Sequence, residues 1–211
     1  MKRFLLIALI IFSLVSCDKT RQYTRKGNHQ YNKKNYPAAD DSYKLALKQD
    51  STFSVANYNL ANSIMQGGTK DYNKAINYYN KYLSQKPSNS KKDTINYSKA
   101  LYNRGNALFA LSQQNKEDEN SMKYLQRAAV DYKNAMLMNP KDTNAKYNYA
   151  LCLWLMKNNN NPDNNQNNQN QNNNSEINQM MEAMKNNEKK TISRVKKHKE
   201  NAQTKRNEKD W

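Results

Sequence analysis

Glycine, cysteine and histidine are scarce in this chain, which excludes several kinds of functional site. Of 211 residues, four are glycine, two are cysteine and two are histidine. The glycines are not clustered as a phosphate-binding loop requires. A zinc site uses about three or four nitrogen or sulfur ligands, and His29 and His198 lie far apart. With no set of nucleophile, base and orienting group either, we predict no metal, no cofactor, no small-molecule substrate and no enzymatic activity.

Acidic residues are also few: 18 Asp and Glu face 35 Lys and Arg, a formal net charge of +17. Such a balance is typical of nucleic-acid binding when the cations form a patch or stripe. Here the excess is spread along the chain, since residues 18–156 carry 22 basic and 11 acidic side chains. We therefore predict a solvated basic surface and no nucleic-acid partner, with attraction to anionic lipids as a secondary effect.

The chain has no apolar run of the roughly 20 residues that span a bilayer. A shorter apolar stretch over residues 4–15 follows Lys2 and Arg3 and leads into Leu14-Val15-Ser16-Cys17. This order resembles the lipobox of bacterial lipoproteins. The resemblance implies a signal peptide over residues 1–16, acylation of Cys17, and an exported protein anchored by lipid and facing the periplasm. An ordinary signal peptide with an incidental cysteine is the alternative, and inner versus outer membrane stays open.

An internal repeat is the strongest pattern in the sequence. Its copies read Tyr36-x-x-Ala39-x-x-x-Tyr43, Tyr72-x-x-Ala75-x-x-x-Tyr79 and Leu125-x-x-Ala128-x-x-x-Tyr132. A segment with a small residue precedes each copy, and these small residues are Gly27, Ala61 and Gly105. Apolar residues three and four apart give a helix one buried stripe. Each copy therefore predicts a pair of helices in close contact at the small residues, with a tyrosine filling the space between neighbouring pairs.

This pattern resembles the tetratricopeptide repeat (TPR) family. The resemblance implies an all-α helix-turn-helix solenoid of about 3.5 repeats within residues 17–157. The repeats fall at residues 20–53, 54–89 and 98–142, with a final helix at 143–157. Extra residues at 90–97 are expected to lengthen the next helix in part, and those within 112–123 to lie at a turn.

Residues 158–174 hold 12 Asn and 3 Gln, a composition that cannot build a core and predicts a disordered linker. A prion-like association segment is the alternative for this stretch. Residues 175–211 predict a basic amphipathic helix and tail. The candidate partner-binding residues of this tail are Met180, Met181, Met184 and Trp211.

In TPR domains the first helix of each repeat lines a concave groove that holds a peptide. Asn amides both donate and accept hydrogen bonds, so a row of them suits a peptide backbone. Three residues match positions of the carboxylate clamp of chaperone-binding TPR domains, but Thr24 and Asn103 fill its two other basic positions, so the clamp is incomplete. The resemblance places these candidates in the groove: Asn28, Tyr31, Tyr58, Asn59, Asn62, Met65, Lys99, Tyr102, Asn106 and Phe109, of which Asn28, Asn59 and Lys99 are the clamp matches.

The order of segments resembles the TPR proteins of the Bat (aerotolerance) operons. The residues that carry this likeness are Met180-Met181-x-Ala183-Met184 and the closing Glu208-Lys209-Asp210-Trp211. The resemblance implies von Willebrand factor A membrane proteins as partners, with a MoxR-type ATPase on the cytoplasmic side, in an envelope complex linked to oxidative-stress tolerance. The alternative is a TPR lipoprotein that organises cell-wall or outer-membrane assembly.

Overall fold

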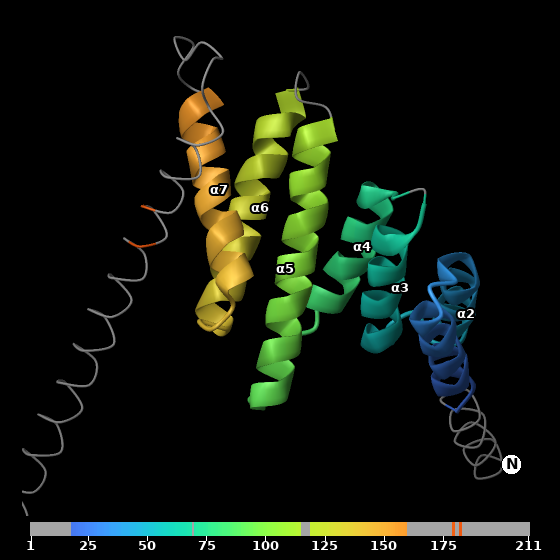
Figure 1. Cartoon of the computed structure of the whole chain (residues 1–211). Helices are drawn as coiled ribbons and strands as arrows, with labels where there is room; N and C mark the ends of the chain where they lie inside the picture. The colour runs from blue at the N-terminus through green and yellow to red at the C-terminus, as the bar shows by residue number, and fades with distance from the viewer. Residues whose placement is uncertain (1–17, 69, 115–118, 160–178, 180–181, 183–211) are drawn as a thin grey trace, which may run out of the picture. The chain divides into compact units, whose positions relative to one another are not determined.

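A computed structural model describes residues 18–68, 70–114, 119–159, 179 and 182, and within these ranges every regular element is a helix. Residues 18–32 form the first helix. Six helices follow in Figure 1: α2 (Tyr36–Gln49), α3 (Ser54–Gln66), α4 (Tyr72–Leu83), α5 (Lys91–Gln114), α6 (Glu119–Met138) and α7 (Thr143–Asn159). The chain divides into two compact units, residues 1–145 and 146–211.

Side-chain caps mark where the second helices of the first two repeats begin. Asn35 precedes α2, and its Oδ1 accepts a hydrogen bond from the backbone N–H of Ala38. Pro37 lies in the first turn of α2, where its missing N–H leaves no hydrogen bond unmade. Asp71 caps α4 in the same way, at 3.0 Å from the backbone nitrogen of Lys74. Because caps of this kind satisfy orphan N–H groups, both helices start where the sequence pattern predicts.

Within the first unit each helix from α2 to α6 packs against the next, and α3 also contacts α5. The last contact brings together the first helices of two successive repeats, which is the arrangement of a solenoid. The shared core consists of small and aromatic side chains. Its members are Ala39, Tyr43, Leu60, Ala61, Ile64, Ala75, Tyr79, Leu83, Ala100, Leu101, Ala135 and Ala145.

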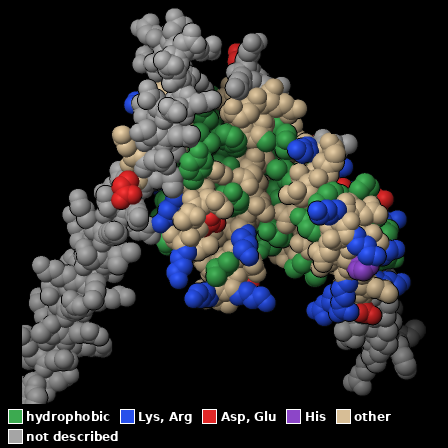
Figure 2. Space-filling view, in the orientation of Figure 1, with side chains coloured by type: hydrophobic (Ala, Val, Ile, Leu, Met, Phe, Trp, Pro, Cys, Tyr) green, Lys and Arg blue, Asp and Glu red, His purple; other side chains and the backbone are tan. Residues whose placement is uncertain are grey.

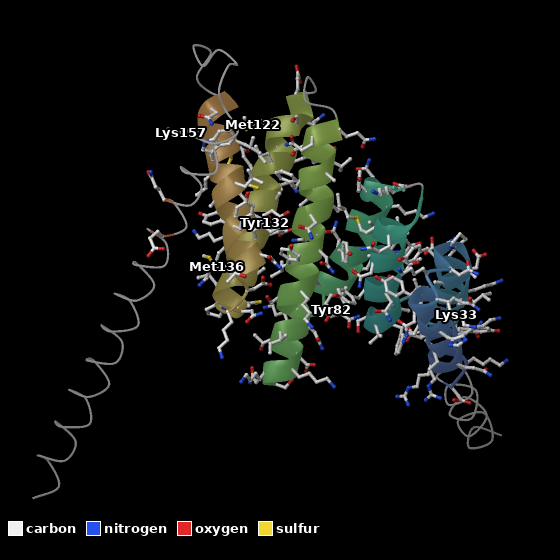
Figure 3. All side chains as sticks on the ribbon, in the orientation of Figure 1. Lys33, Tyr82, Met122, Tyr132, Met136 and Lys157 are labelled. Carbon is white, nitrogen blue, oxygen red and sulfur yellow. The ribbon has the colours of Figure 1, made fainter. Side chains whose placement is uncertain are left out.

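The repeat tyrosines lie directly over the small residues of the preceding helix. A Cβ atom added at Gly27 would stand 2.5 Å from Cε1 of Tyr43, and one at Gly105 would stand 2.8 Å from Cε1 of Tyr132. Figure 3 labels Tyr132 on α6, the helix that pairs with α5. Helix and ring therefore approach as closely as carbon atoms permit, and the predicted close pairing is confirmed at both positions.

The third repeat departs from the predicted turn insertion. Helix α5 has 24 residues and α6 has 20, against 12 to 14 in α2, α3 and α4. The extra residues at 90–97 extend the start of α5, as the sequence predicts. Most of those within 112–123 do not form a turn but continue α5 and begin α6 early. An added helical turn continues the backbone hydrogen bonds and the apolar stripe, which a loop would interrupt.

A buried ion pair ties the two long helices together. Both guanidinium nitrogens Nε and Nη2 of Arg104 lie 2.7 Å from the carboxylate oxygens of Asp131. Arg104 Nη1 also donates to Asn80 Oδ1 on α4 at 2.8 Å. Asp131 is only 3% exposed. Arg104 thus connects α5 to both α6 and α4. The close contact with Asp131 matters because an unpaired buried charge is strongly unfavourable.

In the second unit, residues 146–159 continue α7, and Ala150 and Cys152 are fully buried. Burial raises the pKa of the Cys152 thiol to about 12, which agrees with its prediction as a small core residue. Helix α7 ends at Asn159, so the first two residues of the predicted linker at 158–174 are helical, because the helix continues past the predicted end at residue 157. The rest of that linker, Cys17 and the tail residues Met180, Met181, Met184 and Trp211 lie outside the described residues. Across the described ranges, none of the helices combines the length and the apolar character that crossing a membrane requires.

Candidate peptide-binding groove

Two adjoining depressions lie on the first unit, each about 270 Å³ in volume. They share Tyr31 and Asn62. The first is further lined by Asn28, Asn32, Tyr43 and Asn59. The second is further lined by Tyr58, Met65, Gln66, Tyr79, Asn103 and Asn106. Because most of these residues lie on the helix at 18–32, on α3 and on α5, the first helices of three repeats form one surface. We call the two depressions together the groove.

One hydrogen bond recurs in every complete repeat. The hydroxyl of Tyr43 donates to Asn28 Oδ1 at 2.9 Å, that of Tyr79 to Asn62 Oδ1 at 2.6 Å, and that of Tyr132 to Asn106 Oδ1 at 2.8 Å. In each case a tyrosine of the second helix holds the amide of the first helix. The tyrosine ring is buried, so its hydroxyl needs this acceptor. The three Asn residues therefore have a structural role that their sequence positions did not reveal.

A second set of hydrogen bonds connects neighbouring repeats. Asn59 Nδ2 donates to Asn28 Oδ1 at 2.8 Å, and Asn103 Nδ2 donates to Asn62 Oδ1 at 2.9 Å. Asn103 Nδ2 also lies 3.3 Å from the hydroxyl of Tyr58. Each acceptor oxygen thus receives one bond from its own repeat and one from the next. These shared oxygens fix the orientation of the amides along the groove.

Tyrosine rings pack together at and beside the second depression. The ring centroids of Tyr58 and Tyr79 are 6.1 Å apart, and those of Tyr58 and Tyr82 are 5.2 Å apart. Tyr82, labelled in Figure 3, also lies 6.4 Å from Tyr97 of α5. Burial raises the pKa of Tyr31, Tyr58 and Tyr82 above that of a free phenol. Their hydroxyls therefore stay protonated at neutral pH and are able to donate hydrogen bonds.

The groove differs from the rest of the surface in charge. Figure 2 shows Lys and Arg side chains at many separate points on the visible face. None of the residues that line either depression is charged. The groove is thus a neutral strip of amides and phenols on a basic protein.

Seven of the ten predicted groove residues line the depressions: Asn28, Tyr31, Tyr58, Asn59, Asn62, Met65 and Asn106. Lys99, Tyr102 and Phe109 are not among the lining residues. Lys99 is exposed on α5, and the ring of Tyr102 packs at 5.7 Å from that of Tyr132. Tyr102 is thus part of the packing beside the groove.

The architecture matches solved TPR domains. The first TPR domain of Spaghetti (RPAP3) bound to an HSP90 peptide superposes with a TM-score of 0.52 at 20% identity, covering 66% of this chain and 94% of that one. The TPR domain of Arabidopsis OM64 gives 0.51 at 20% identity, covering 65% and 97%. The second TPR domain of human RPAP3, in complex with an HSP70 peptide, gives 0.50 at 17% identity, covering 65% and 98%. The fold is a TPR solenoid. No protein-family model and no curated protein matches the sequence.

Five residues that the sequence did not identify as groove residues line the TPR groove: the repeat tyrosines Tyr43 and Tyr79, and Asn32, Gln66 and Asn103. Asn32 and Gln66 lie four positions after Asn28 and Asn62. Residues four apart share a helix face, so this spacing was a signal that could have found both. Asn103 occupies a position where a carboxylate clamp would have a basic residue, and the structure shows that its amide joins two repeats.

Metal-ligating side chains do not gather around the TPR groove in the described ranges. These ranges hold no group of three or more His, Cys, Asp or Glu side chains placed to bind a metal. The groove supplies hydrogen bonds and aromatic surface, which is the chemistry of recognition.

Proposed function

We propose that this protein is a non-enzymatic TPR adaptor, tethered to a membrane, that holds a partner protein in the groove. The observation that carries the proposal is the continuous strip of oriented amides and tyrosine rings across three repeats. Such a strip offers hydrogen bonds to a peptide backbone and apolar contacts to its side chains. Two of the similar TPR domains were solved with HSP90 and HSP70 peptides bound, which supports a peptide as the ligand class.

The sequence resemblances support two further parts of the proposal, the membrane tether and the identity of the complex. The lipobox-like residues ending at Cys17 support a lipid anchor and export to the periplasm. The segment order and the tail motif ending at Trp211 support a role in the Bat aerotolerance complex, with von Willebrand factor A membrane proteins as partners. A TPR lipoprotein that organises cell-wall or outer-membrane assembly is the alternative, and it shares the same tether and groove.

Affinity isolation of the full chain from crosslinked membranes tests this function. The Bat assignment expects von Willebrand factor A proteins among the crosslinked partners, whereas wall-synthesis or porin-assembly proteins in their place would support the alternative. Deleting residues 176–211 is expected to leave a folded TPR unit that no longer recovers the complex, and Trp211→Ala to weaken recovery. Full recovery with the deleted chain would show that the tail has no part in the complex.

The tether has its own test. Cys17→Ser removes the acylated thiol, so the variant is expected to remain unprocessed or to move to the soluble fraction. Fractionation with a salt wash separates a lipid anchor from electrostatic attachment, because salt screens attraction between exposed charges. A variant that is processed and stays as firmly membrane-bound as the parent would refute the lipid anchor.

A further inference from the structure

We propose that the groove takes an internal, uncharged segment of a partner polypeptide, read through its main chain, and that it does not select a free carboxyl terminus. This inference rests on the proposed function, because it names the class of ligand for the same groove. Three observations carry it: the charge of the lining, the hydrogen-bonding groups of Asn28 and Asn59, and the surroundings of Thr24 and Asn103.

The lining gives a carboxylate no ionic partner. All the side chains around the two depressions are amides, phenols or a thioether. A carboxylate that enters such a site loses hydration and gains only neutral donors. A carboxylate forms charge-assisted hydrogen bonds even with neutral donors, but without a cation it has no ion pair to offset the loss of its hydration. A free carboxyl terminus or an acidic side chain therefore loses more hydration free energy than it regains in the groove. A neutral peptide unit loses much less hydration free energy when it moves from water into the groove.

Asn28 and Asn59 together offer one donor and one acceptor to a ligand. Their mutual hydrogen bond uses Asn59 Nδ2 and Asn28 Oδ1, and the Tyr43 hydroxyl is the other donor to that oxygen. Asn28 Nδ2 and Asn59 Oδ1 have no hydrogen-bond partner among the residues that the structure describes. A peptide unit has one C=O and one N–H, so it complements this pair whatever its side chain is.

The two neutral positions where a carboxylate clamp would have cations are already engaged in the fold. The hydroxyl of Thr24 is buried and donates to the backbone oxygen of Thr20 at 2.8 Å. The amide of Asn103 donates to Asn62 and to Tyr58. Lys99 is exposed and does not line either depression. Both positions thus hold neutral side chains that are engaged in the fold, Thr24 within its own helix and Asn103 between two repeats.

Selection from a random-peptide library in two formats tests the proposal on the full chain purified in detergent. One format places the random segment at a free carboxyl terminus, and the other places it between fixed flanking sequences. We expect uncharged sequences to be enriched in the internal format. For the best peptide, amidation of its carboxyl terminus is expected to change Kd by less than about twofold. Raising the salt concentration from about 0.1 to about 0.5 M is expected to change Kd equally little.

Variants locate the binding site. Asn59→Ala removes one of the two groups that face the ligand, and we expect it to weaken the selected peptide at least about fivefold. Asn77→Ala, on an exposed part of α4, is the matched control and is expected to bind as the parent does. Asn103→Lys introduces a cation into the second depression and is expected to create a preference for the free-carboxylate form of the peptide. Circular dichroism checks that each variant is folded.

The outcomes distinguish a wrong ligand class from a wrong proposed function. Enrichment confined to acidic or free-carboxylate sequences, with Kd rising steeply with salt, would overturn the proposal while leaving a peptide-binding groove. Binding that is equal in Asn59→Ala and in the control would also overturn it, because the ligand would lie elsewhere. Enrichment in neither format would contradict the groove as a peptide site and with it the proposed function.

Discussion

Gly27→Ala offers the sharpest test of the packing that shapes the groove. The added methyl carbon would lie 2.5, 2.6 and 2.9 Å from three ring carbons of Tyr43, whereas unstrained carbon atoms stay about 3.5–4.0 Å apart. Tyr43 is 1% exposed and its hydroxyl is bonded to Asn28. A shift of the ring would therefore disturb its buried packing and break the hydrogen bond to Asn28.

Two effects of opposite sign decide the magnitude. Alanine stabilises a helix interior by about 1 kcal/mol relative to glycine. Overpacking a close contact typically costs about 1–3 kcal/mol, and the shortest contact here is far inside the normal range. We expect a net loss of about 1–2 kcal/mol, which corresponds to a fall in Tm of roughly 3–8 °C for a domain of this size.

Thermal and urea unfolding followed by circular dichroism measures the effect. Gly105→Ala is expected to lose less, since its nearest ring carbon is 2.8 Å away. Gly68→Ala is the control: no atom lies within 4 Å of the added carbon, so stability is expected to stay within about 1 kcal/mol of the parent. A Gly27→Ala protein that melts at or above the parent temperature would refute the close approach of Tyr43.

Three further predictions concern buried polar groups. Asp131→Asn breaks the buried pair with Arg104 and is expected to destabilise the first unit by about 3 kcal/mol; unchanged urea unfolding would show that the pair contributes nothing. Burial raises the pKa of Tyr31 and Tyr58 in the folded chain, so the unfolded chain releases these protons at a lower pH than the folded chain does. The free energy of unfolding is therefore expected to be unaffected by these groups below a pH of about 10 and to fall as the pH rises further. Melting curves across that range, read beside phenolate absorbance, measure this, and a Tm that holds steady to higher pH would contradict it. In a Cys17→Ser chain, Cys152 is expected to resist a thiol reagent at pH 8 until the protein unfolds, because its pKa is about 12; rapid labelling of the folded chain would show that the thiol is exposed.

The sequence predicted the helix pairs well because local spacing and packing agree there. Ala39 and Tyr43 are four residues apart on one helix face, and both are buried as the pattern requires. Pro37 marked the start of α2 for the same reason, since its restricted backbone suits a first helical turn. In these elements the identity of each residue and its periodic position point to the same structure.

The sequence does not decide whether the insertion in the third repeat forms a turn or extends the helices. A helical turn and a loop of the same length differ little in composition, and the stretch around Ser112 contains polar residues suited to either. The structure extends the helices and joins them by a hydrogen bond of 2.8 Å from the Ser121 hydroxyl to the backbone oxygen of Ser112. That contact is made only once both helices are extended, so helical periodicity alone does not predict it.

The sequence predicts which residues share a helix face but not how they are hydrogen-bonded. Helix periodicity places Asn28 and Asn62 on one surface, but the direction in which each amide points depends on tyrosines from the second helices. Helix periodicity likewise places Lys99 on the same face as Asn103, one turn before it, and only the structure shows that Asn103 lines a depression and Lys99 does not. Both features are tertiary, and a single sequence does not contain the distances that decide them.

The central claim is that a partner protein lies in this groove, and site-specific photocrosslinking in native membranes tests it most directly. A photoreactive amino acid at Tyr31, which borders both depressions, is expected to join the chain covalently to a partner, with the crosslinked residues falling in an uncharged internal segment. The same group at Leu45, which is 41% exposed on α2 and lines neither depression, is expected to give no such product. Equal crosslinking from both positions, or a partner captured only from Leu45, would contradict the claim.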